Sequence, residues 1–149
     1  MRKSDEIKFT IPGKPIPLAR VRASGKSKTF YIPQHSKEFQ KKVKIYAYNA
    51  GLRKTRKNIY LKAVFYRADK RRCDIDNLLK NLLDGLRSFF NDAQVIALEA
   101  TKLLCESEEE ERTEVIIRKK DKIVPVKKKK KKKAKNEESK NDKQMENNN

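Results

Sequence analysis

Residues 59–98 read IYLKAVFYRADKRRCDIDNLLKNLLDGLRSFFNDAQVIAL, and their patterns predict a strand, a helix and a second strand at the centre of the fold. Its first eight residues, 59–66, are rich in β-branched and aromatic side chains and predict a central strand. Leucines then recur at helical spacing, which predicts an amphipathic helix. The expected apolar face of this helix carries Leu79, Leu82, Leu83, Leu86 and Phe90. Residues 95–98 predict the strand that follows.

The N-terminal residues predict a strand followed by a basic arm. Residues 7–11 alternate apolar and polar side chains, as a half-buried strand does, and Pro12 and Gly13 end the pattern. Residues 14–22, KPIPLARVR, combine two prolines that stiffen the backbone with three cations. Residues 29–32 predict a further short strand.

A second helical pattern opens at Pro33 and predicts an amphipathic helix that ends at Gly51 as its C-cap. The residues near one face of this helix are Phe39, Val43, Ala47 and Ala50.

The C-terminal part predicts one more strand at residues 115–117. Residues 106–111 hold five acidic residues around Ser107 and predict the turn before that strand, with a solvated acidic loop as the favoured interpretation. The resulting order β, β, α, β, α, β, β predicts an α+β fold with a small mixed β-sheet and two packing helices.

The composition excludes several classes of protein. The chain has 149 residues and a net charge of +19, so an ordinary near-neutral enzyme is excluded and one domain is expected. The longest runs without a charge span eight residues, far below the about 18 apolar residues of a membrane span. Because no apolar signal segment follows the N-terminus, a cytoplasmic location with reduced thiols at Cys73 and Cys105 is expected.

Residues 127–149 are predicted to form a disordered basic tail. They contain ten lysines, seven of them consecutive, and four acidic residues, with almost no apolar side chains to bury. The remaining residues 1–126 keep a net charge of +13, which is +19 less the +6 of the tail, so the expected folded domain is itself basic. Both a tail with no specific target and an interaction tail fit this composition.

An acidic cluster interrupts this basic chain at Asp74 and Asp76. One interpretation is purely structural: Asp76 is a good N-cap for the predicted helix. The stripe formed by Asp76, Lys80 and Asp84 then fits a solvated helix face, with an ion pair worth about 0.2–0.5 kcal/mol.

A functional interpretation competes with the structural one. In extended backbone Asp74 and Asp76 share a face, and two like charges there are unfavourable unless a cation joins them. Mg²⁺ prefers hard oxygen ligands and fits such a pair. Arg71 and Arg72 precede the acids, so an acidic notch lies in a basic surface. A metal-dependent nuclease has this arrangement, with cations that hold the phosphate backbone and carboxylates that hold a metal.

Residues 73–86, CDIDNLLKNLLDGL, followed by NDAQV at 91–95, resemble the signature of the RusA-type Holliday-junction resolvases, which is DxDNLxK, then LD, then DDxQV. The opening FTIPGKPIPLARVR at 9–22 is similar to the family's N-terminal segment, a strand followed by G-x-P-x-P-x-x-R-x-R. The resemblance implies a homodimeric endonuclease of small α+β fold, dependent on Mg²⁺ with Mn²⁺ as a substitute. It also implies cutting of four-way DNA junctions by paired nicks in recombination and repair.

Carried over residue by residue, the resemblance places the metal-binding acids on Asp74, Asp76 and Asp92 and the catalytic lysine on Lys80. The sequence departs from the family at Asn91, where the usual pattern has Asp, and the linker before it is about two residues short. Asp84 matches the LD position, and it is expected to have an orienting or structural role rather than to be a metal ligand. The candidates for phosphate contacts are Lys14, Arg20, Arg22, Arg71 and Arg72.

Two alternatives to a junction-cutting enzyme remain. The first is a non-catalytic basic protein that binds nucleic acid, including branched DNA, in which the acids only cap and solubilise a helix. The second is a degenerate family member that binds junctions without cutting them, which the loss of charge at Asn91 motivates.

Overall fold

The computed structural model describes residues 5–26 and 29–121 of the chain. Its elements, in chain order, are β1 (Glu6–Pro12), β2 (Arg22–Ala23), β3 (Phe30–Tyr31), α1 (Gln34–Asn49), β4 (Asn58–Arg67), α2 (Ile75–Leu86), the 3-10 helix η1 (Asp92–Gln94), β5 (Val95–Leu104), the 3-10 helix η2 (Glu108–Glu110) and β6 (Arg112–Lys120). The predicted tail at 127–149 and the domain boundary at residue 126 lie outside the described residues.

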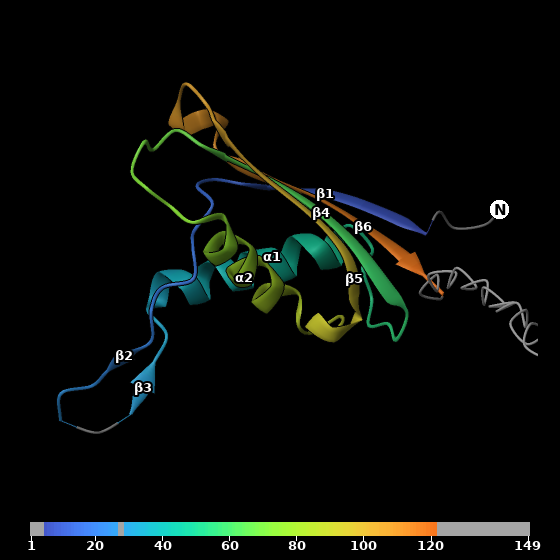
Figure 1. Cartoon of the computed structure of the whole chain (residues 1–149), viewed down its shortest axis with the longest axis horizontal. Helices are drawn as coiled ribbons and strands as arrows, with labels where there is room; N and C mark the ends of the chain where they lie inside the picture. The colour runs from blue at the N-terminus through green and yellow to red at the C-terminus, as the bar shows by residue number, and fades with distance from the viewer. Residues whose placement is uncertain (1–4, 27–28, 122–149) are drawn as a thin grey trace, which may run out of the picture.

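The main sheet has four strands in the order β1-β6-β4-β5. The pairs β1–β6 and β4–β6 are antiparallel, whereas β4 and β5 are parallel, so the sheet is mixed. Both long helices lie on one face of this sheet (Figure 1). The predicted α+β fold, with a mixed sheet and two packing helices, is therefore confirmed. The strands β2 and β3 pair with each other in a second small sheet, which reaches away from the helices (Figure 1).

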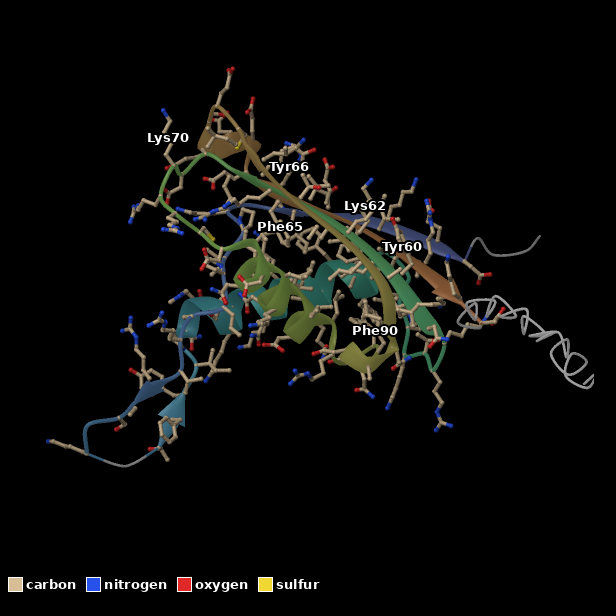
Figure 2. The ribbon with its side chains drawn as sticks, in the orientation of Figure 1. Tyr60, Lys62, Phe65, Tyr66, Lys70 and Phe90 are labelled. Carbon is tan, nitrogen blue, oxygen red and sulfur yellow. The ribbon has the colours of Figure 1, made fainter. Side chains whose placement is uncertain are left out.

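The core lies between the sheet and the helices. In β4 every second side chain is buried, from Ile59 through Leu61 and Ala63 to Phe65. Figure 2 shows Phe65 and Phe90 on the helix side of the sheet and Tyr60, Lys62 and Tyr66 on the opposite side. This alternation confirms the central strand predicted for residues 59–66, because β4 pairs on both edges and packs on one face.

The helix α1 begins and ends as predicted. Pro33 is its N-cap residue, and Gly51, directly after the C-cap Ala50, has a φ of +97°. Glycine adopts this left-handed conformation without the steric cost that a Cβ would add, so the helix stops there. The predicted burial of Ala50 is wrong: it is exposed, because it belongs to the turn after the last helical residue.

The buried face of α2 differs from the prediction. The helix buries Leu78, Asn81, Leu82, Gly85 and Leu86, whereas Leu79 and Leu83 are only half-buried. The cause is close packing on α1: a Cβ at Gly85 would lie 2.7 Å from the Cβ of Val43. Phe90 is buried as predicted, but it lies beyond the end of the helix.

Asn81 is buried with a hydrogen-bond partner at each end of its side-chain amide. Its Oδ1 accepts a 2.9 Å hydrogen bond from Nε2 of Gln40, and its Nδ2 donates a 2.8 Å bond to the carbonyl of Ile16. A buried amide with both ends paired avoids the cost of an unsatisfied polar group. These bonds connect the basic arm, residues 14–22, to both helices.

The strands at the C-terminal end are longer than predicted, since β5 and β6 span ten and nine residues. The acidic residues 106–111 form the connection between them, as expected. They are not all solvated, because Glu111 is buried next to β6. Within the described residues no helix is long and apolar enough to cross a membrane.

Candidate active site

Asp74 and Asp76 flank the start of α2. Asp74 is the N-cap residue in extended conformation, with φ −79° and ψ 131°, and its side chain makes no capping hydrogen bond. Asp76 lies in the first turn. The predicted N-cap role of Asp76 and the predicted extended backbone across the pair are therefore wrong: the N-cap is Asp74, and the helix begins at Ile75, two residues earlier than predicted. Both carboxylates are exposed, next to a helix N-terminus that favours negative charge.

Lys80 lies one helical turn beyond Asp76, and its Nζ is 3.7 Å from Oδ2 of Asp76. Both side chains are exposed, so a ligand can reach them. The structure thus places Asp74, Asp76 and Lys80 along the N-terminal half of α2.

Asp84 and Asp92 belong to a different group. Arg87 donates to Asp84, with Nη2 2.8 Å from Oδ1, and the same nitrogen lies 3.8 Å from Oδ2 of Asp92. Arg87 therefore neutralises two acids at the C-terminal end of α2. Sequence reasoning missed this residue, although its spacing of three from Asp84 is a signal for an ion pair on a helix.

The side chain of Gln94 fixes the segment NDAQ, residues 91–94, in place. Its Oε1 accepts a 2.8 Å bond from the backbone N–H of Asn91, and its Nε2 donates to the carbonyls of Thr55 and Lys57 at 3.0 Å and 2.9 Å. Asn91 completes this capping box with its own side chain. Gln94 thus fastens the start of β5 to the residues before β4, a supporting role that the sequence analysis did not assign.

The structure does not bring Asp92 to Asp74 and Asp76. Asp92 precedes β5 at the end of the sheet where β4 starts, as the bonds of Gln94 show. Cys73 lies after β4, and its carbonyl accepts a bond from Nζ of Lys102 near the end of β5. Because β4 and β5 are parallel, these are opposite ends. The twelve residues of α2, about 18 Å long, separate them (Figure 1). Among residues 5–26 and 29–121, no three His, Cys, Asp or Glu side chains are grouped to hold a metal.

Cationic residues surround Asp74. A cavity of about 550 Å³ is lined by Asp74 and Asn77 together with Lys14, Arg71 and Arg72, three of the five predicted phosphate contacts. The other two, Arg20 and Arg22, are exposed where the arm continues into β2. The backbone N–H of Leu18 donates 2.9 Å to the carbonyl of Asn77, so the arm passes the first turn of α2.

Asp69 organises this cationic loop and was missed in the sequence. Its Oδ2 accepts a 2.8 Å bond from Nζ of Lys14, and its Oδ1 accepts a 2.8 Å bond from the backbone N–H of Arg71. These bonds, led by that from Lys14, lower the pKa of Asp69 to about 2. The carboxylate stays charged at neutral pH and fixes the loop between β4 and α2.

The chain matches the family model of endodeoxyribonuclease RusA over residues 12–118. No curated protein matches it. The matched region spans most of the described structure, from the last residue of β1 into β6, and includes the acidic, cationic and arm segments described above. The chain therefore belongs to the RusA family of endodeoxyribonucleases.

Proposed function

We propose that this chain is a divalent-metal-dependent endonuclease that resolves four-way DNA junctions by paired nicks during recombination and repair. The observation that carries the proposal is the N-terminal half of α2, where Asp74 lines a cationic cavity and Asp76 and Lys80 form an ion pair one turn apart. Carboxylates, a lysine and several arginines around one cavity suit the binding and hydrolysis of a phosphodiester.

Asp74 and Asp76 are the proposed metal ligands in this end of the molecule. Mg²⁺ is often held by one or two carboxylates, with water and substrate phosphate oxygens as the other ligands. Two exposed carboxylates, one at the N-cap and one in the first turn, fit that requirement, and Mn²⁺ is expected to substitute. When bound, the metal would polarise the phosphate and lower the pKa of a coordinated water.

Lys80 is the proposed stabiliser of charge in the transition state. Its ion pair with Asp76 is long and exposed, so the ammonium is available to a phosphate oxygen placed beside the same turn. A fixed cation at the point where negative charge develops is a strong source of rate acceleration.

A homodimer offers a way to add Asp92 to this site. The strand β5 is an edge of the main sheet and exposes Leu98, Leu103 and Leu104. Long apolar edge strands favour pairing with another strand. Antiparallel pairing of β5 with β5 of a second copy would place the start of one strand beside the end of the other. Asp92 of one copy would then approach the end of the sheet that carries Asp74 of the other.

The same two-fold symmetry suits the substrate. A four-way junction has near two-fold symmetry, so a symmetric dimer presents one site to each of two strands. The arms at residues 14–22, with Lys14, Arg20 and Arg22, and the loop with Arg71 and Arg72 are the proposed contacts to the DNA backbone.

A junction-binding protein without cleavage is the second candidate. The distance of Asp92 from Asp74 and the uncharged Asn91, whose side chain is engaged in the capping box, favour it. A synthetic four-way junction and a linear duplex of the same sequence, each incubated with Mg²⁺ or with chelator, separate the two candidates. Cleavage only of the junction and only with metal supports the proposed enzyme, whereas metal-independent binding with no cleavage supports the second candidate.

A further inference from the structure

Arg67, the last residue of β4, is buried without adequate partners. Its side chain is 8% exposed, and the sole ion pair of its guanidinium within the described residues is to Asp69, at 3.8 Å from Nη2. Its Nε and Nη1 are buried and have no hydrogen-bond partner. Buried charged donors without partners are costly, so their presence needs a physical explanation.

Asp69 cannot neutralise Arg67 by itself. The same carboxylate already accepts bonds from Nζ of Lys14 and the N–H of Arg71, and Nε of Arg71 lies 3.4 Å from it. One acid therefore faces three cations. Glu111 is a second buried acid, placed just beyond the Tyr66–Arg112 pair of β4 and β6, and its Oε2 has no hydrogen-bond partner, but it forms no ion pair with Arg67.

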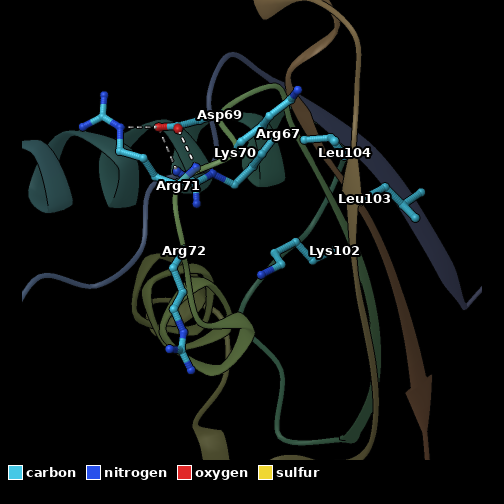
Figure 3. A pocket seen from close by; sticks show the side chains of 8 residues that line it. All are labelled: Arg67, Asp69, Lys70, Arg71, Arg72, Lys102, Leu103 and Leu104. Atoms are coloured by element: carbon cyan, nitrogen blue, oxygen red, sulfur yellow. Dashed lines mark hydrogen bonds and ion pairs between the residues drawn. The ribbon is translucent and has the colours of Figure 1, made fainter.

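Arg67 lines two adjoining cavities. The first, of about 300 Å³, lies between the loop after β4 and the end of β5, where Arg71, Arg72 and Lys102 contribute cations (Figure 3). Leu103 and Leu104 form an apolar part of its wall. The second is the 550 Å³ cavity that reaches Asp74. Arg67 is thus placed between a cationic pocket and the candidate active site.

We propose that the pocket around Arg67 binds a backbone phosphate of the DNA substrate, next to the phosphate that is cut. Arginine is the preferred partner of phosphate, and an anion in the cavity would lie against Arg67, which lines it, and would offset the charge of the surrounding cations. The leucine wall suits the apolar face of a deoxyribose. Arg67 is a positioning residue in this account, which rests on the proposed function, and Lys102 assists it from β5.

Arg67→Met tests the site, because it keeps the length and removes the charge. Arg56→Met, an exposed arginine in the loop before β4, is the matched control. The first measurement is thermal unfolding in chelator with increasing inorganic phosphate, at ionic strength held constant with chloride. We expect saturable stabilisation of the wild-type and Arg56→Met proteins that is lost in Arg67→Met.

The second measurement is junction binding in chelator as a function of salt. Arg67→Met should weaken binding about tenfold and lower the slope of log K against log salt by about 1 relative to Arg56→Met. Arg67→Lys should restore part of the binding, which a purely structural role would not predict. Neither measurement requires cleavage, so both test the phosphate site even if the chain does not cut DNA.

Three results would overturn the inference. One is equal phosphate stabilisation in Arg67→Met and wild type. Another is equal junction affinity and salt slope in Arg67→Met and Arg56→Met. The third is that phosphate dissociates the wild-type protein from dimer to monomer in sedimentation. That result would show that the pocket holds a carboxylate of a second copy, with which phosphate competes. If Arg67→Met does not fold, Arg67→Lys with a weakened phosphate response supports the site and an unchanged response refutes it.

Discussion

Lys80 and Asp76 form an ion pair one turn apart on α2, with Nζ of the lysine 3.7 Å from Oδ2 of the aspartate. The two side chains are 62% and 64% exposed. Exposed helix pairs of this kind contribute only about 0.5 kcal/mol or less to stability. The pair is therefore better explained by what it offers to a ligand than by its contribution to folding.

Asp76→Asn is expected to abolish cleavage of a four-way junction and to leave junction binding unchanged or tighter. The amide is a poorer metal ligand, and removal of the negative charge frees Lys80 to contact phosphate. Gel-based cleavage and binding assays with Mg²⁺ measure both effects. Glu38→Gln on α1, an exposed acid away from the site and from β5, is the control and should cut like wild type. Undiminished cutting by Asp76→Asn would refute the metal assignment.

A mixed dimer of Asp76→Asn and Asp92→Asn subunits is expected to nick the junction, although neither homodimer cuts. If Asp92 serves the site of the second copy, one of the two sites in the mixed dimer retains all its acids. If all three acids act within one subunit, each site carries a defect. Two affinity tags isolate the mixed species for the assay. An inactive mixed dimer beside an active wild type would exclude the shared site.

Gly85→Ala is expected to destabilise the fold by about 1–3 kcal/mol. The added Cβ would lie 2.7 Å from Cβ of Val43 and 3.1 Å from the carbonyl oxygen of Gln40, so α1 and α2 must separate. Gly25→Ala is the control, because nothing lies within 4 Å of its Cβ position, and it should change stability by less than about 0.5 kcal/mol. Urea unfolding measures both variants. Equal stability of the two would contradict the described helix packing.

The contribution of Asp69 to stability should depend on acidic pH. Its pKa in the folded protein is about 2, below the ordinary 3.8, so its ion pairs stabilise the fold above pH 3.8 and are lost as the pH falls toward 2. The stability difference between wild type and Asp69→Asn should shrink over that interval. Thermal unfolding between pH 5 and pH 2 measures it. Lys14→Met removes the main cause of the low pKa and should reduce the difference at pH 5, whereas a constant difference would contradict the assignment.

Apart from β2 and the two 3-10 helices, the order and type of the elements followed from the sequence because each depends on local patterns. Alternation predicts β4, leucine spacing predicts α2, and Gly51 marks the end of α1. The sequence did not predict which face of α2 is buried, since the burial of Asn81 depends on partners 41 and 65 residues away along the chain. No local pattern reports such contacts.

The site was predictable in part for the same reason. Asp74, Asp76 and Lys80 lie within two turns of one helix, so their proximity could be inferred from spacing. Asp92 is 16 residues from Asp76, yet the parallel pairing of β4 and β5 places it at the far end of α2. Arg67 was missed because a charged residue at a strand end is usually solvated, and its burial depends on the loop held by Asp69.

The most direct test of the central claim uses a supercoiled plasmid that extrudes a cruciform, which is a four-way junction, incubated with the full chain and Mg²⁺. Paired nicks across the junction linearise the plasmid, whereas unpaired nicks give open circles. The account predicts linear product that requires both the cruciform and the metal. Intact plasmid, or equal nicking of a plasmid without the inverted repeat, would contradict it.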